Sequence, residues 1–191
     1  VAIRARRLKV KTENLFLSGE SELNGIITHI DRMEPKFIIV DSIQTIFNSE
    51  LDSLPGSPSQ IKDCGQKFLE VAKSKNTTVL IVGHVTKEGT IAGPKMLEHL
   101  VDTVLYLEGD ERYDHRILRS TKNRFGATHE VGIFQMDASG LSEIQNPSEI
   151  FLEERSIDVS GTCIYPSLEG TRPILLEIQA LVTNTSYNTP Q

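Results

Sequence analysis

The sequence has 191 residues, of which 38% are hydrophobic and 24% are charged, so the chain can bury an ordinary globular core. Acidic side chains outnumber basic ones by 26 to 20, and the formal charge of -6 excludes a uniformly basic nucleic-acid binder but allows a local basic stripe. The apolar runs are shorter than the roughly 20 residues that a membrane-spanning helix needs. The two cysteines, Cys64 and Cys163, lie far apart in the sequence, which fits a cytoplasmic protein without a disulfide framework.

The first part of the chain predicts a helix tail, a short strand and an amphipathic helix. Val1 opens a basic stretch typical of the end of a helix, so we expect the chain to be part of a longer protein. Residues 15–17 predict a short strand. Apolar residues then recur at three- and four-residue spacing until Pro35 ends the pattern, at Leu23, Ile26, Ile27, Ile30 and Met33.

Three continuous apolar runs follow, and each predicts a strand. They span residues 37–41, 78–82 and 103–107. Such runs are typical of parallel strands that are buried on both faces. A polar loop at 48–58 and a helix that begins at Pro58 separate the first two strands. The residues of this helix that we expect to face inward are Ile61, Cys64, Phe68, Val71 and Ala72. A second polar loop, 85–95, and a short helix precede the third.

The pattern changes after Gly109. Residues 116–120 and 130–136 alternate apolar and polar side chains, as half-exposed antiparallel strands do. The sequence therefore predicts an α/β fold with a mainly parallel, mixed sheet and an antiparallel extension. Beyond a seam near residue 146, two more strands are expected at 162–165 and 174–182. They begin a second domain or form a hairpin that packs on the first.

Polar groups at the ends of two predicted strands are the first candidates for chemistry. Asp41 closes the FIIVD run, where open α/β sheets bind ligands, and has the form of a Walker B aspartate that holds Mg²⁺. It could also simply cap the next turn. His84 ends the neighbouring strand in the same way, either as a phosphate sensor or as a satisfied polar residue.

Basic residues supply the second set of candidates. The 85–95 loop contains two glycines, a proline and two lysines, which favours a binding loop over a plain connection. In the run KNRFG, Lys122 and Arg124 would alternate on one side of a strand and grip phosphate, with Phe125 as an aromatic anchor. Two basic residues on a strand are also typical of a solvated face. The phosphate loop GxxxxGK[ST] is absent from the sequence.

Taken together, these segments resemble the RadA (Sms) family of bacterial DNA repair proteins. The resemblance rests on FIIVDSIQT, PGSPSQI, VGHVTKEGTIAGPKMLEHLVDTVLYLEGD, KNRFG and PSLEGTRPILLEIQALV, in that order. It implies a RecA-like ATPase fold for residues 1–146, without the Walker A part. Residues 147–191 would be a linker and the beginning of a Lon-protease-like domain. The family's zinc module would lie upstream.

The resemblance also implies roles for individual residues. Asp41 would hold Mg²⁺ through water and, with Ser42, contribute to the ATP site, while His84 would sense the γ-phosphate. Lys122 and Arg124 would reach ATP at a subunit interface and take part in catalysis. Lys87 and Lys95 would contact DNA from the 85–95 loop, and residues 48–58 would form another DNA loop.

The implied function is that of a DNA-dependent ATPase in recombinational repair, which drives branch migration as a hexameric ring in the cytoplasm. Its expected partners are single-stranded and branched DNA and a RecA-type recombinase, with no membrane. We expect this chain alone not to hydrolyse ATP, because it lacks the phosphate loop. The alternative is a non-hydrolysing DNA-binding or oligomerisation module with the same fold.

Overall fold

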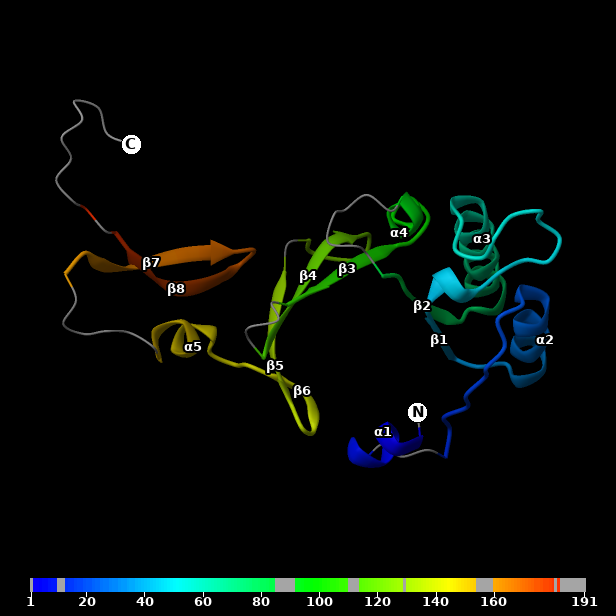
Figure 1. Ribbon diagram of the computed structural model, residues 1–191, viewed down its shortest axis with the longest axis horizontal. Coiled ribbons are helices and arrows are strands. Elements are labelled where there is room, and N and C mark those ends of the chain that lie inside the picture. Colours follow the sequence, from blue (N-terminus) through cyan, green and yellow to red (C-terminus); the bar gives the residue numbers. More distant parts are fainter. Residues whose placement is uncertain are drawn as a thin grey trace, which may run out of the picture. The chain divides into compact units, whose positions relative to one another are not determined.

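A computed structural model describes residues 2–9, 13–84, 92–109, 114–128, 130–153, 160–180 and 182. The chain divides into two compact units. Figure 1 labels its helices α1–α5 and strands β1–β8. We call Lys11–Val104 the helical unit, and Val1–Val10 together with Leu105–Gln191 the strand-rich unit. In the described parts of the chain, no helix combines the length and apolar character that crossing a bilayer requires.

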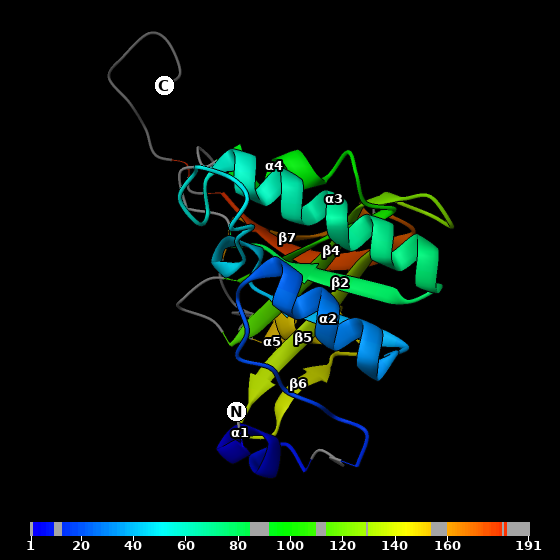
Figure 2. The same ribbon diagram turned by 90° about the vertical axis from the view of Figure 1, so that its right-hand side faces the viewer.

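The helical unit is built around a parallel pair of strands. β1 (Phe37–Asp41) pairs with β2 (Thr78–Val82) in a register that sets Asp41 opposite Val82. Helices α2 (Leu23–Met33) and α3 (Pro58–Lys75) lie on the same side of this pair (Figures 1 and 2). The strand side chains that pack against the helices are Ile38, Val40, Val79 and Ile81.

Among the described residues of the helical unit, nothing packs on the other face of the pair. Phe37, Ile39 and Leu80 are between 43% and 58% exposed. Within this unit the strands are therefore covered on one face, not on both as predicted. The reason is that the described residues place helices on one face only, while an apolar run by itself does not say what covers it.

The helices follow their sequence signals. α2 begins after Glu22, whose carboxylate accepts a hydrogen bond from the Gly25 N–H at 2.8 Å, and it ends at Glu34 in the left-handed region, just before Pro35. α3 begins at Pro58 and ends at left-handed Asn76. Its buried side is the predicted one, with Ile61, Cys64, Phe68 and Val71. Burial raises the pKa of the Cys64 thiol to about 11, so the thiol stays neutral and packs as a small apolar group.

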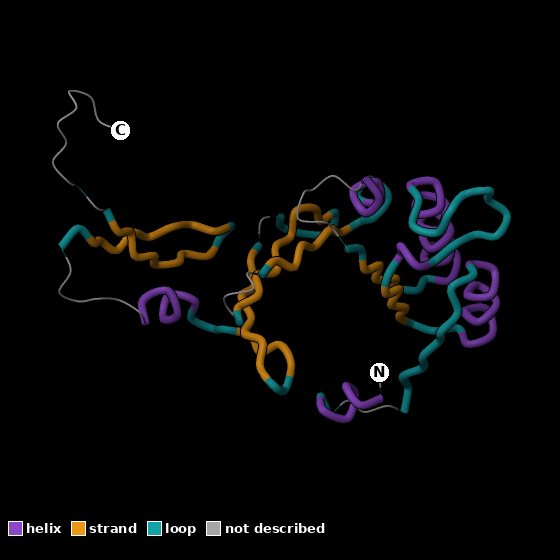
Figure 3. The backbone as a smooth tube through the Cα atoms, in the orientation of Figure 1, coloured by secondary structure: helices purple, strands orange, loops and turns teal. Residues whose placement is uncertain are grey.

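The strand-rich unit carries the antiparallel extension. β3 (Thr103–Glu108), β4 (His115–Asn123), β5 (Val131–Asp137) and β6 (Gly140–Glu143) form one sheet in that order. β4, β5 and β6 follow one another as an antiparallel meander (Figure 3). The antiparallel extension and the mixed α/β class are confirmed. β3, however, joins this sheet and does not extend the parallel pair.

A hairpin completes the strand-rich unit. β7 (Thr162–Glu169) and β8 (Arg172–Gln179) pair in an antiparallel register, and α5 (Pro147–Glu153) contacts β8. Ile174 of β8 is buried in one apolar cluster with Val131 and Ile133 of β5. Within this unit the hairpin therefore packs on the sheet. The domain boundary near residue 146 and the Lon-like assignment stay predictions.

Three short elements remain. α1 (Ala2–Arg7) belongs to the strand-rich unit, while the 3-10 turn η1 (Ile43–Thr45) and α4 (Ala92–Leu97) belong to the helical unit. Residues 15–17 form no strand, and Phe16 and Leu17 are 70% and 66% exposed. That prediction is wrong, because three apolar residues without a pairing partner do not make a strand.

Candidate functional site

The carboxyl edge of the parallel pair brings Asp41 and His84 together. Asp41 is the last residue of β1, and His84 lies two residues beyond β2. Because the strands run parallel and in register, both residues emerge at the same edge, as predicted. The Asp41 Oδ1 and His84 Nε2 atoms are 3.9 Å apart, and the two side chains are 70% and 72% exposed. They are therefore open to a ligand.

The segment that follows β1 is hydrogen-bonded to the segment that follows β2. The Gln44 side chain donates a hydrogen bond from Nε2 to the His84 carbonyl at 2.9 Å, which links η1 to the end of β2. Its Oε1 atom is buried and has no hydrogen-bond partner among the described residues. Sequence reasoning missed Gln44. The neighbouring sequence carried no signal for it, because its partner is a backbone carbonyl 40 residues away.

Ser42 has a different environment from Asp41. The peptide bond between them is cis, and Ser42 is only 7% exposed. Its carbonyl accepts hydrogen bonds from the Thr45 N–H at 3.1 Å and from the Thr45 hydroxyl at 2.8 Å. These contacts hold η1 in place. The contact of Ser42 with a nucleotide stays a prediction.

The donor set at this edge suits a cation that keeps most of its water. Asp41 offers one exposed hard oxygen ligand. Within the described ranges, His, Cys, Asp and Glu side chains nowhere gather in threes that could hold a metal ion. Mg²⁺ is commonly bound through one or two carboxylates, with water and phosphate oxygens completing its octahedron. A single carboxylate therefore fits Mg²⁺ bound together with a phosphate ligand, but not a site made of protein groups alone.

The two expected DNA segments differ in charge. The 48–58 loop contains Glu50 and Asp52 and no lysine or arginine, so it offers phosphate no cation. Lys95 is exposed on α4. Lys87 lies outside the described residues. Of these two predicted DNA contacts, Lys95 is the one that lies among the described residues.

The side chain of Asn123 stabilises the KNRFG turn through two hydrogen bonds to its backbone. This last residue of β4 accepts a hydrogen bond from the Phe125 N–H on its Oδ1 at 3.1 Å, and its Nδ2 donates to the Ala127 carbonyl at 3.3 Å. Lys122 is half-buried on the strand, whereas Arg124 lies beyond the strand end and is exposed. The expected alternation of the two cations along one strand is therefore wrong, because the turn begins between them.

Phe125 follows Arg124 in this turn, and its side chain is 83% exposed. Its role as an aromatic anchor stays a prediction. Lys122 and Arg124 belong to the strand-rich unit and Asp41 and His84 to the helical unit. Their roles at one nucleotide stay predictions.

Comparison with known proteins gives a consistent set of relatives. The chain is 52% identical over 189 residues to the DNA repair protein RadA of Bacillus subtilis, a match that covers 99% of this chain and 41% of that protein. It is 52% identical over 178 residues to the RadA protein of Synechocystis, covering 93% and 35%. The chain thus spans about two fifths of the length of the curated relatives it matches. No family model matches.

Among solved structures, the RadB recombinase matches 64% of this chain and 59% of its own at 16% identity, with a TM-score of 0.48. A KaiC-like protein from Pyrococcus horikoshii matches 64% and 55%, also at 16% identity, with a TM-score of 0.46.

Proposed function

Because the chain belongs to the RadA family of bacterial DNA repair proteins, we propose that it is part of an ATP-hydrolysing enzyme that acts on DNA in recombinational repair. The observation that carries the proposal is the 52% identity over 189 residues, which includes the edge where Asp41 and His84 meet. Residues 1–146 would form the later part of a RecA-like ATPase domain, and residues 147–191 a linker and the start of a Lon-like domain.

At the nucleotide, the protein's main task is to position phosphates and neutralise charge. Asp41, beside Ser42, would hold Mg²⁺ through water at the edge of the sheet. Bound there, Mg²⁺ supplies neutralisation of the charge that develops on the phosphate oxygens. His84, whose Nε2 lies 3.9 Å from Asp41 Oδ1, would sense the γ-phosphate, and Gln44 would pass a shift of His84 to the turn after β1 through its hydrogen bond.

Lys122 and Arg124 would complete the ATP site from a neighbouring subunit of a hexameric ring. Arg124 is exposed, and the hydrogen bonds of Asn123 stabilise the turn on which it lies. An exposed side chain on an ordered turn favours contact with another molecule. Its planar guanidinium suits a two-pronged contact with phosphate. We assign both residues a catalytic role of the arginine-finger kind.

DNA would be held mainly through phosphate contacts from Lys95 and Lys87. We propose single-stranded and branched DNA as substrates, branch migration as the outcome, a RecA-type recombinase as partner and the cytoplasm as location. The chain by itself would not turn over ATP.

The test is an ATPase assay of the full-length protein, with and without single-stranded DNA. We expect hydrolysis that DNA stimulates. Binding of DNA without any hydrolysis would contradict the proposal and favour the alternative of a non-hydrolysing DNA-binding or oligomerisation module.

A further inference from the structure

Helix α3 contacts both segments that are candidates for binding DNA. We infer that α3 positions the two segments, holding the 48–58 loop through Gln60 and α4 through Gly65. The inference rests on the proposed function, which places DNA contact at Lys95 and Lys87, and it adds the polar 48–58 loop as a contact made through neutral hydrogen-bonding groups, because this loop has no cation. The contacts themselves stand on the geometry alone.

Gln60 acts as an internal hydrogen-bonding partner for the loop. Its side chain is 1% exposed. Its Oε1 accepts the Asn48 N–H at 2.7 Å, and its Nε2 donates to the carbonyls of Asn48 and Ser53, each at 3.0 Å. One amide thereby satisfies both backbone groups of Asn48 and spans the loop to Ser53. Only a side chain with an acceptor and two donor hydrogens can make all three bonds.

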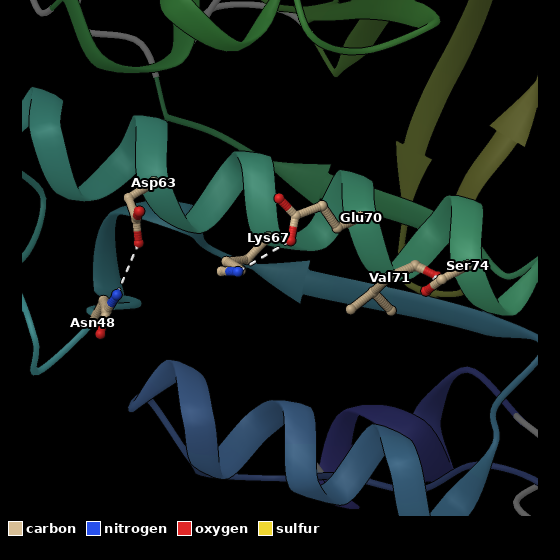
Figure 4. Close-up of polar contacts among 6 residues, drawn as sticks. All are labelled: Asn48, Asp63, Lys67, Glu70, Val71 and Ser74. Carbon is tan, nitrogen blue, oxygen red and sulfur yellow. Dashed lines mark hydrogen bonds and ion pairs between the residues drawn. The ribbon is translucent and has the colours of Figure 1, made fainter.

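Further bonds join the same turns of α3 to the loop. Asn48 donates from Nδ2 to Asp63 Oδ2 at 3.0 Å, the contact drawn in Figure 4. The Oδ1 of Asn48 accepts the Glu50 N–H at 3.0 Å, and the Ser59 hydroxyl donates to Ser53 Oγ at 3.0 Å. The polar loop is therefore preorganised by α3 at residues 48–53.

Gly65 of α3 provides the contact with α4, the second of the two segments. A Cβ atom at this position would collide with the side chain of Leu97, so α4 packs where only glycine leaves room. Leu97 is 6% exposed in the apolar core, whereas Lys95 of the same short helix is exposed. The Gly65–Leu97 contact thus fixes the helix that carries Lys95.

Gln60 and Gly65 are five positions apart, or roughly 8 Å along a helix at 1.5 Å per residue. Ile61 and Cys64, which lie between them, are fully buried and anchor this stretch of α3 to the core. A rigid helix therefore sets the spacing of the two segments. Damage at either contact should weaken DNA engagement without touching Asp41 or His84.

The test uses the full-length protein and two independent variants. Gln60→Met keeps the length of the side chain and removes its hydrogen bonds. Gly65→Ala introduces a steric clash between the new methyl group and the side chain of Leu97. We expect each to raise the single-stranded DNA concentration for half-maximal ATPase stimulation at least fivefold, with basal ATP hydrolysis within twofold of wild type. Gln60→Met should also speed amide hydrogen exchange in residues 48–54. Gln66→Met, at an exposed position of the same helix, is the matched control.

A rescue separates positioning from general destabilisation. Adding Leu97→Ala to Gly65→Ala restores space between the helices and should recover most of the DNA response. An unchanged half-maximal DNA concentration in both Gln60→Met and Gly65→Ala would overturn the inference, and so would unaltered exchange in residues 48–54 of Gln60→Met. A wild-type protein that hydrolyses ATP without responding to DNA would instead overturn the proposed function, while hydrogen exchange would still report on the Gln60 contacts.

Discussion

Asp41 Oδ1 lies 3.9 Å from His84 Nε2, although Asp41 ends β1, His84 follows β2, and the whole of α3 separates them in sequence. The parallel register of β1 and β2 produces this proximity. A carboxylate and an imidazole that face solvent at the edge of a sheet contribute little to stability, so their position favours a role in binding. Changes at this edge should therefore separate activity from folding.

Phe68 should be a main determinant of stability in the helical unit. Its side chain is fully buried between α3 and the sheet. We expect Phe68→Ala to lower the free energy of unfolding by about 3–5 kcal/mol, as is typical of a large aromatic removed from a core. Leu54→Ala is the control, because Leu54 is 81% exposed and should cost little. Urea denaturation measures both, and similar losses for the two variants would contradict the assigned core.

Glu22 should make the stability of α2 depend on pH. The hydrogen bond from the Gly25 N–H holds the pKa of the Glu22 carboxyl below its ordinary value of 4.5. The stabilisation is then complete above about pH 4.5 and is lost as the pH falls through the lowered pKa. Glu22→Ala should cost about 0.5–1 kcal/mol at pH 7 and less at pH 3. Denaturation at the two pH values tests this, with Glu13→Ala as control, and an equal loss at both would contradict it.

The sequence predicted α2, α3, β1 and β2 well because their signals are local. The apolar spacing of α2 and α3, Pro35 and Pro58 mark the helices, and the FIIVD run marks the strand that delivers Asp41. The proximity of His84 followed once both strands were expected to be parallel.

What the sequence did not predict depends on tertiary contacts. The hydrogen bonds of Gln44 and Gln60 reach backbone groups that are remote in sequence, and nothing in an isolated glutamine distinguishes it from a solvated one. Likewise, β3 belongs to the antiparallel sheet and not to the β1–β2 pair because it pairs with β4, which its own sequence does not indicate.

Lys87 and Lys95 should set the salt dependence of DNA binding. Replacing Lys87 and Lys95 with alanine should weaken binding of the full-length protein to duplex DNA. The slope of log affinity against log salt should flatten by up to about 0.9 per lost phosphate contact. Lys67→Ala is the matched control, since Lys67 is exposed on α3 and paired with Glu70 at 3.1 Å. An unchanged slope in the double variant would show that the 85–95 segment is only a connection.

Arg124 should act on the ATP of a neighbouring subunit. Arg124→Ala should cripple hydrolysis while leaving stability within roughly 0.5 kcal/mol, as expected of an exposed side chain. Arg124→Lys should not restore full activity, because an ammonium group cannot reproduce the planar contact of a guanidinium. Lys122→Ala should have the same effect on hydrolysis. ATPase rates and thermal melts check each variant.

Mixed rings show whether this action is in trans. Combining Arg124→Ala subunits with Asp41→Ala subunits should recover part of the activity, because some interfaces then join an intact Asp41 to an intact Arg124. A cis arrangement allows no recovery, since every subunit carries a defect in its own site. Activity no higher than that of the single variants, with subunit mixing confirmed by mass spectrometry, would refute the trans role.

The most direct test of the nucleotide site is the magnesium dependence of ATP binding to the full-length protein, wild type against Asp41→Asn. The substitution removes the charge of a side chain that is 70% exposed, so melting should change little. We predict that Mg²⁺ strengthens ATP binding in the wild type, and that Asp41→Asn loses most of this strengthening but keeps its metal-free affinity and its melting temperature. Equal strengthening by Mg²⁺ in both proteins, or a loss of binding that follows unfolding of the variant, would contradict the assignment of Asp41 to the metal.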